Sequence, residues 1–130
     1  MTPEEIEVVR GVIAQLEDHP EFADRFYQRL FEVAPPTRAM FPDVAAQQQK
    51  LTAELTAMVS LLGNLGTLET RAHELGDRHR GYGVRAAHYR IAREVMAEAL
   101  ADVLGDRFGP EEAAAWNRAT SLITELMMSA

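Results

Sequence analysis

The sequence predicts an all-α single domain, and three observations support this prediction. Apolar residues recur at spacings of three and four along nearly the whole chain, which is the period of one face of a helix. The strict apolar–polar alternation of a half-buried strand does not occur. Prolines and glycines divide the chain into about six main segments. A length of 130 residues suits one domain with one hydrophobic core, so we expect a single unit over residues 1–130.

The first helix is expected to begin at a capping box. Thr2 occupies the cap position, Pro3 the first helical position, and Glu5 follows the cap by three residues. His19-Pro20 ends this helix, because a residue before proline is disfavoured in helical conformation. The apolar stripe between these two signals consists of Ile6, Val9, Ile13 and Leu16.

The second helix carries a strongly aromatic face and ends at Pro35-Pro36. Its large side chains are Phe22, Phe26, Tyr27, Leu30 and Phe31. A short connector over residues 37–42 follows, and it holds Met40-Phe41 in what we expect to be a turn. A third helix is expected from the cap residue Asp43 to the break at residues 63–66.

Three further helices are expected in the second half of the chain. The fourth runs from about Thr67 to Arg80 and ends at Gly81-Tyr82-Gly83; the last begins at Pro110, after Gly109. On the fourth helix one face holds Leu68, Ala72, Leu75 and His79. The fifth carries the stripe Ala92, Val95, Met96, Ala99, Leu100, Val103 and Leu104. The last buries Trp116, Ala119, Leu122, Ile123, Leu126 and Met127.

Composition excludes several classes of function. The net charge is −7 and no basic stripe is visible, which argues against nucleic-acid binding and against attachment to an anionic membrane surface. The chain has no cysteine, so disulfides, thiolate metal sites and covalent haem attachment are excluded. No apolar stretch is long enough to span a bilayer and no signal core follows the N-terminus. We therefore expect a cytoplasmic protein.

His79 is the leading candidate for chemistry. It ends an apolar helix face just before a glycine-rich break, and no second histidine lies at metal-site spacing. A lone histidine on an apolar face is often a core residue whose hydrogen bonds are satisfied. A neutral imidazole presented from a helix into an apolar pocket is also the proximal ligand of a haem iron.

Four segments in order carry a resemblance that favours the second interpretation. They are Phe26-Tyr27-x-x-Leu30-Phe31, Met40-Phe41-Pro42, Gln47-x-x-x-Leu51 and His79-x-x-Tyr82-Gly83-Val84-x-x-x-His88-Tyr89. Together they resemble the flavohaemoglobin-type bacterial globins, and more narrowly their single-domain members. The resemblance covers nearly the whole chain, as far as Trp116 in the last helix, and implies a globin fold of six to eight helices around a non-covalent haem b.

The resemblance also implies a role for each site residue. His79 is expected to be the proximal ligand to the iron, and Phe41 to pack on the porphyrin. Tyr27 and Gln47 are expected on the distal side, where a diatomic gas binds, with Leu51 lining that pocket. The cofactor site is further expected to include Val84 and Tyr89, the latter as a hydrogen-bond partner that orients His79.

The function expected from this resemblance is reversible binding of O2, NO and CO. An alternative is NO dioxygenation, which would need a separate reductase, because 130 residues leave no room for the reductase domain of a flavohaemoglobin. A haem-free sensor or scaffold is the second alternative, and a homodimer remains open. In many members of that globin family a glutamate in the last helix makes the proximal imidazole more electron-donating. Up to Ala130 this chain has no counterpart of that glutamate, since Glu125 lies too early, so peroxidase-like chemistry is not expected.

Overall fold

The computed structural model describes residues 1–129, and within them the regular structure is entirely helical. The predicted all-α class is therefore confirmed. Six α-helices are joined in part by three short 3-10 helices. In chain order they are α1 (Pro3–Gln15), η1 (Leu16–Asp18), α2 (Glu21–Val33), η2 (Pro35–Met40), α3 (Val44–Ser60), α4 (Leu65–Gly81), α5 (Ala86–Leu104), η3 (Gly105–Arg107) and α6 (Pro110–Met128).

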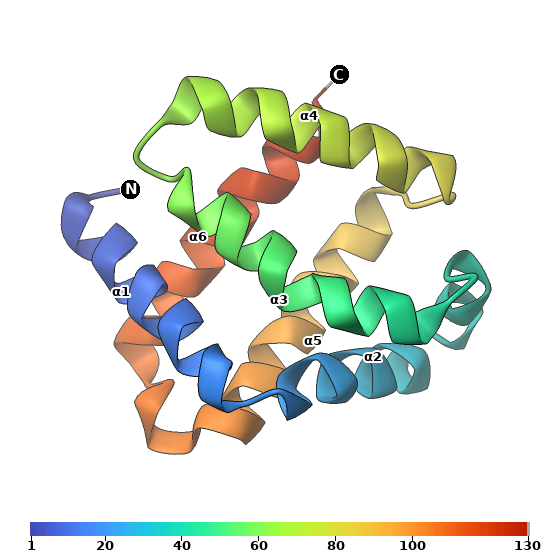
Figure 1. Cartoon of the computed structure of the whole chain (residues 1–130), viewed down its shortest axis with the longest axis horizontal. Coiled ribbons are helices and arrows are strands. Elements are labelled where there is room, and N and C mark those ends of the chain that lie inside the picture. The colour runs from blue at the N-terminus through green and yellow to red at the C-terminus, as the bar shows by residue number, and fades with distance from the viewer. Residues whose placement is uncertain (130) are drawn as a thin grey trace.

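The helices cross one another around a single core instead of forming a parallel bundle. Figure 1 shows α4 lying across the end of α6 near the C-terminus, while α2 runs below α3. The most extensive packing is between α4 and α6, between α2 and α5, and between α1 and α6. α2 also packs against α3, and α4 contacts α3 less extensively.

The core is formed by the stripes that helical periodicity predicts. Trp116 of α6, Phe22 of α2 and Leu68 of α4 are among the largest fully buried side chains. At about 25 cal/mol per Å² of apolar surface, burial of such side chains is the main term that holds the helices together. Two members of the predicted stripe on α6, Leu122 and Leu126, are only partly buried and pack at the edge of the core.

The helix starts follow the expected chemistry, with two corrections. Thr2 and Glu5 form the predicted capping box, and Asp43 accepts a hydrogen bond from the Ala46 amide at 3.1 Å. The connector before Phe41 is a 3-10 helix over Pro35–Met40, not an irregular turn, because two prolines pre-set the backbone for tight turns. The fourth helix begins at Leu65, since Asn64 caps it by accepting from the Thr67 amide.

No helix in the described part of the chain is both long enough and apolar enough to cross a bilayer.

Candidate functional site

A cavity of about 460 Å³ lies between α2, α3, α4, α5 and α6. This volume is typical of sites for small molecules and cofactors. Most of its wall is apolar, and it includes four methionines, which are Met40, Met58, Met96 and Met127. Every site residue predicted from the sequence lines this one cavity, namely Tyr27, Phe41, Gln47, Leu51, His79, Val84 and Tyr89.

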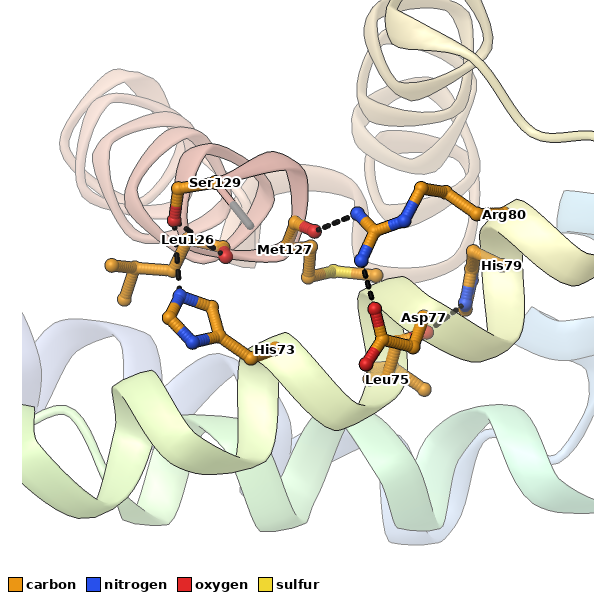
Figure 2. Close-up of polar contacts among 8 residues, drawn as sticks. All are labelled: His73, Leu75, Asp77, His79, Arg80, Leu126, Met127 and Ser129. Carbon is orange, nitrogen blue, oxygen red and sulfur yellow. Dashed lines mark hydrogen bonds and ion pairs between the residues drawn. The ribbon is translucent and has the colours of Figure 1, made fainter.

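His79 presents a neutral imidazole to the cavity from the last turns of α4. Its Nδ1 lies 2.8 Å from the carbonyl oxygen of Leu75 (Figure 2). A carbonyl only accepts, so Nδ1 carries the proton and donates, and Nε2 keeps its lone pair. Burial lowers the pKa of His79, and the neighbouring Arg78 adds to this, while the bond to Leu75 and the charge of Glu54 oppose it. The ring is therefore prepared to act as a metal ligand through Nε2.

The turn after α4 fixes this end of the helix. The amides of Tyr82 and Val84 both donate to the carbonyl oxygen of His79, at 3.0 and 3.1 Å. Gly83 between them has a φ of 88°, a conformation that other residues rarely adopt. The backbone of His79 is thus tied to the turn that places Val84 on the cavity wall.

Tyr89 contacts His79 differently from the expectation. The two rings are stacked, with centroids 5.9 Å apart and planes 21° apart. The Tyr89 hydroxyl is buried and has no hydrogen-bond partner in the described residues. The expected hydrogen bond to His79 is not formed, because the Leu75 carbonyl already occupies Nδ1. Burial raises the pKa of Tyr89, against an opposing effect of Arg80, so the hydroxyl stays protonated.

Tyr27 is held by an aromatic cluster formed by α2 and the segment that follows it. Its ring lies edge-on to Phe26 at 5.0 Å and to Phe41 at 5.3 Å, and it also contacts Phe31 at 6.0 Å. Such pairs fix ring orientation as well as burying area. Tyr27 is only 5% exposed, and burial raises its pKa to about 12. The cluster therefore presents a phenol that remains a hydrogen-bond donor at all physiological pH values.

Gln47 and Leu51 stand one turn apart on α3 and both line the cavity. The cap at Asp43 places Gln47 in the first turns of this helix, where its amide donates to the Asp43 carbonyl at 3.2 Å. The side-chain amide of Gln47 offers both a donor and an acceptor to the cavity. A second polar group thus lines the same cavity as Tyr27.

Several charged residues of the cavity wall were not predicted from the sequence. Glu54 follows Gln47 by seven residues on α3, a spacing that returns to the same face and could have identified it. One of its carboxylate oxygens is buried without a partner in the described residues, and the other lies 4.0 Å from Arg78. Arg93 of α5 also lines the cavity and donates to the hydroxyls of Ser121 and Thr124.

These residues fit a haem. Within residues 1–129 no cluster of three or more His, Cys, Asp or Glu side chains is arranged to hold a bare metal ion. A single neutral imidazole in an apolar cavity is one of the protein ligands that a haem iron takes. Lys50 and Arg78 on the wall supply cations that could pair with the haem carboxylates.

Comparison with known proteins agrees with this geometry. The family model described as Globin matches residues 24–127. The flavohaemoprotein of Bacillus subtilis is 29% identical over 92% of this chain. An anaerobic nitrite reductase of Oryza sativa subsp. indica is 26% identical over 91% of this chain and 86% of its own length.

A solved structure shares the whole fold. It is an engineered carbene transferase, a candidate nitric oxide dioxygenase from Rhodothermus marinus. It matches with a TM-score of 0.87 at 26% identity, over 98% of this chain and 90% of that one. By contrast, the chain spans only about a third of the flavohaemoproteins that it matches, 31% and 32% of the two from Bacillus subtilis and Bacillus cereus.

Proposed function

The chain belongs to the globin family, and on that premise we propose that it binds haem b non-covalently and uses it to bind O2, NO and CO reversibly. The observation that carries this proposal is the pairing of a neutral imidazole, His79, with a buried phenol, Tyr27, on the wall of one apolar cavity. We propose that the globin domain extends over residues 1–130 and that the protein is cytoplasmic.

The proximal side would be held by His79 and the residues around it. Nε2 of His79 is the atom that would bind the iron, because Nδ1 is occupied by Leu75. Phe41 would pack against the porphyrin face and Val84 would exclude water from it, while Leu51 would line the distal pocket. The bound haem supplies an iron centre with a free coordination position for a diatomic gas.

The distal side would discriminate between gases through hydrogen bonding. The haem would make a bound O2 a negatively charged hydrogen-bond acceptor, and a bound CO a much weaker one. The Tyr27 hydroxyl would donate to that charge, and the Gln47 amide would supply a second donor. A hydrogen bond to a charged acceptor contributes roughly 1.5–3 kcal/mol, which corresponds to about a ten- to hundredfold slower loss of O2.

NO dioxygenation with a separate reductase is the second candidate function. It is favoured by the likeness to a candidate nitric oxide dioxygenase and to flavohaemoproteins. Fast re-reduction by a cellular donor and rapid turnover of NO would favour it, whereas a long-lived O2 complex with slow NO turnover would favour simple binding. A haem-free scaffold is the third candidate, but it would have no use for an apolar cavity of about 460 Å³ that presents His79.

The test is an absorbance spectrum of the purified protein, reduced and then exposed to CO. We expect a sharp CO-haem Soret band that weakens in His79→Ala and is restored by added imidazole. The matched control is His73→Ala on the same helix, because His73 contacts Ser129 at 3.1 Å and does not line the cavity (Figure 2). No Soret band after haem is added, or an equal loss in both variants, would overturn the proposal.

A further inference from the structure

The charge of this chain is strongly segregated. Residues 78–93 contain five arginines and two histidines but no aspartate or glutamate. This segment therefore carries +5 in a chain whose net charge is −7, so the remaining residues carry −12. The segment forms the end of α4, the following turn and the start of α5, which lie at one side of the molecule (Figure 1).

Four of these arginines are exposed, and we call them the basic collar: Arg78, Arg80, Arg85 and Arg90. Arg78 contacts Glu54 at 4.0 Å, and Arg80 pairs with Asp77 and donates to the Met127 carbonyl (Figure 2). Neither Arg85 nor Arg90 has a carboxylate within 4.0 Å among residues 1–129. Half of the collar is thus free to meet an external anion.

The collar adjoins an opening of the cavity. Arg78 itself lines the cavity, as do Tyr82, Val84, His88 and Tyr89, which lie between the collar residues along the chain. Tyr82 is 52% exposed, so the cavity wall reaches the surface here. An exposed tyrosine among arginines has the composition typical of the centre of a protein–protein interface.

Helix stability explains Arg78 and Arg80, which lie in the last turn of α4, where partial negative charge favours cations. It does not explain Arg85 and Arg90 at the start of α5. The N-terminus of a helix carries partial positive charge and favours acidic side chains. The first turns of α1, α2 and α6 each hold two of them, whereas those of α3, α4 and α5 hold none, and at α5 the cap residue is itself a cation, Arg85. The backbone dipole of α5 thus adds to the positive potential of the collar, at a cost to the helix.

We propose that the basic collar is the docking surface for the acidic face of a separate electron-donor protein. This inference rests on the proposed haem binding and on the second candidate function, in which a separate reductase serves the haem. Four exposed arginines, of which Arg78 lines the cavity, match a small footprint, and transient electron-transfer encounters have small, polar interfaces. Opposite charges on the two proteins would steer the encounter toward the side of the cavity where His79 lies.

A protein partner fits better than an extended polyanion. A membrane surface or a nucleic-acid duplex presents negative charge over a wide area, and it would also face the −12 carried by the rest of the chain. A compact acidic face would contact the collar alone. The segregation of charge therefore favours a small acidic protein.

The test is a titration of the haem-loaded protein with oxidised flavodoxin, a small acidic protein that carries flavin mononucleotide. Binding is measured from chemical-shift changes at 10 mM and 300 mM NaCl. We expect binding at low salt that weakens at least tenfold in the double variant Arg85→Glu, Arg90→Glu, with the difference closing at high salt. The thermal midpoint of that variant should not fall, because it places acid at the start of α5.

The matched control is Arg10→Glu, Arg25→Glu, which changes the net charge by the same amount on α1 and α2. We expect it to weaken binding less than threefold. Equal weakening in both double variants would mean that net charge alone matters, and absence of binding at low salt would mean that the collar does not dock acidic proteins. Collar-dependent binding to phosphatidylserine vesicles without binding to flavodoxin would assign the collar to a membrane. Each of these three results overturns the proposal.

If the double glutamate variant loses its structure, the double variant Arg85→Gln, Arg90→Gln replaces it. We expect this variant to weaken flavodoxin binding by a smaller factor, and unchanged binding would contradict the proposal. The CO-haem Soret band is recorded on the same samples. A normal band without docking refutes the collar alone, whereas absence of the band refutes the proposed function whatever the docking result.

Discussion

Gly76 of α4 lies directly against the backbone of Met127 in α6. A Cβ atom at Gly76 would overlap the Met127 carbonyl oxygen, so only glycine fits this position without a shift of one helix. The same carbonyl accepts a hydrogen bond from Arg80 at 3.2 Å (Figure 2). A second contact between the two segments joins His73, three residues before Gly76, to Ser129, two residues after Met127. Because His79 stands one turn after Gly76, the contact between Gly76 and Met127 sets the position of the candidate iron ligand.

Gly76→Ala is therefore expected to push α4 away from α6 and to displace His79. Overpacking of this kind costs about 1–3 kcal/mol of stability, and haem affinity should fall with it. The measurements are urea unfolding and the rate of haem loss to an acceptor protein. Gly11→Ala is the control, since nothing lies within 4 Å of a Cβ there and helix propensity should stabilise α1 by roughly 0.5–1 kcal/mol. Equal stability and equal rates of haem loss in the two variants would contradict the close contact between Gly76 and Met127.

Tyr89→Phe should be tolerated or stabilising, because it removes a buried hydroxyl without a partner in the described residues. We expect a gain of up to about 1 kcal/mol and no change in the iron–histidine stretching frequency of the reduced protein, since the phenylalanine ring can still stack on His79. Tyr89→Leu removes the stacked ring and should change that frequency. A shift in Tyr89→Phe would indicate that the hydroxyl does contact His79.

Tyr27→Phe should speed dissociation of O2 by about ten- to hundredfold, the loss of one hydrogen bond to a charged acceptor. The effect on CO should be far smaller, because CO develops little charge. Stopped-flow ligand replacement measures both rates. Phe26→Leu, a change beside Tyr27 in the aromatic cluster, controls for altered packing. Equal acceleration of both gases in Tyr27→Phe would exclude the tyrosine as the distal donor.

The exposed ion pairs of Arg29, one with Glu98 of α5 and one with Glu32 of its own helix α2, should contribute little. Arg29 contacts Glu98 at 3.0 Å and Glu32 at 3.4 Å, and all three side chains are at least half exposed. Arg29→Ala should cost less than about 1 kcal/mol. Phe22→Ala, on the same helix and fully buried, should cost about 3–5 kcal/mol. Urea unfolding of both variants decides whether burial or charge holds α2 in place.

Helical periodicity and the caps predicted the elements, because each signal is local. Thr2, Asp43 and Pro110 each mark the start of a helix as expected. The four ordered segments of the resemblance identified the residues that line the cavity. What could not be predicted depends on contacts between distant segments. Gly76 of α4 meets Met127 of α6, and Tyr89 of α5 stacks on His79 of α4; no spacing along the chain encodes these choices.

Stability at alkaline pH should depend on Tyr27. Burial raises the pKa of this residue to about 12 from an ordinary value of 10. As the pH rises, the Tyr27 hydroxyl therefore ionises in the unfolded chain before it ionises in the folded one. The contribution of Tyr27 to the free energy of unfolding is fully present below pH 10 and is lost as the pH rises toward 12. Between pH 9 and pH 11 the haem-free protein should lose about 1 kcal/mol more stability than Tyr27→Phe.

Urea unfolding at the two pH values provides this measurement, and the comparison with Tyr27→Phe cancels the contribution of other groups that titrate in the same range, including Tyr89. A parallel loss in both proteins would mean that the Tyr27 hydroxyl ionises as it does in water. In that case the phenol would be solvated and its role as a buried donor toward the gas would fail, because water would compete for the same hydrogen bond.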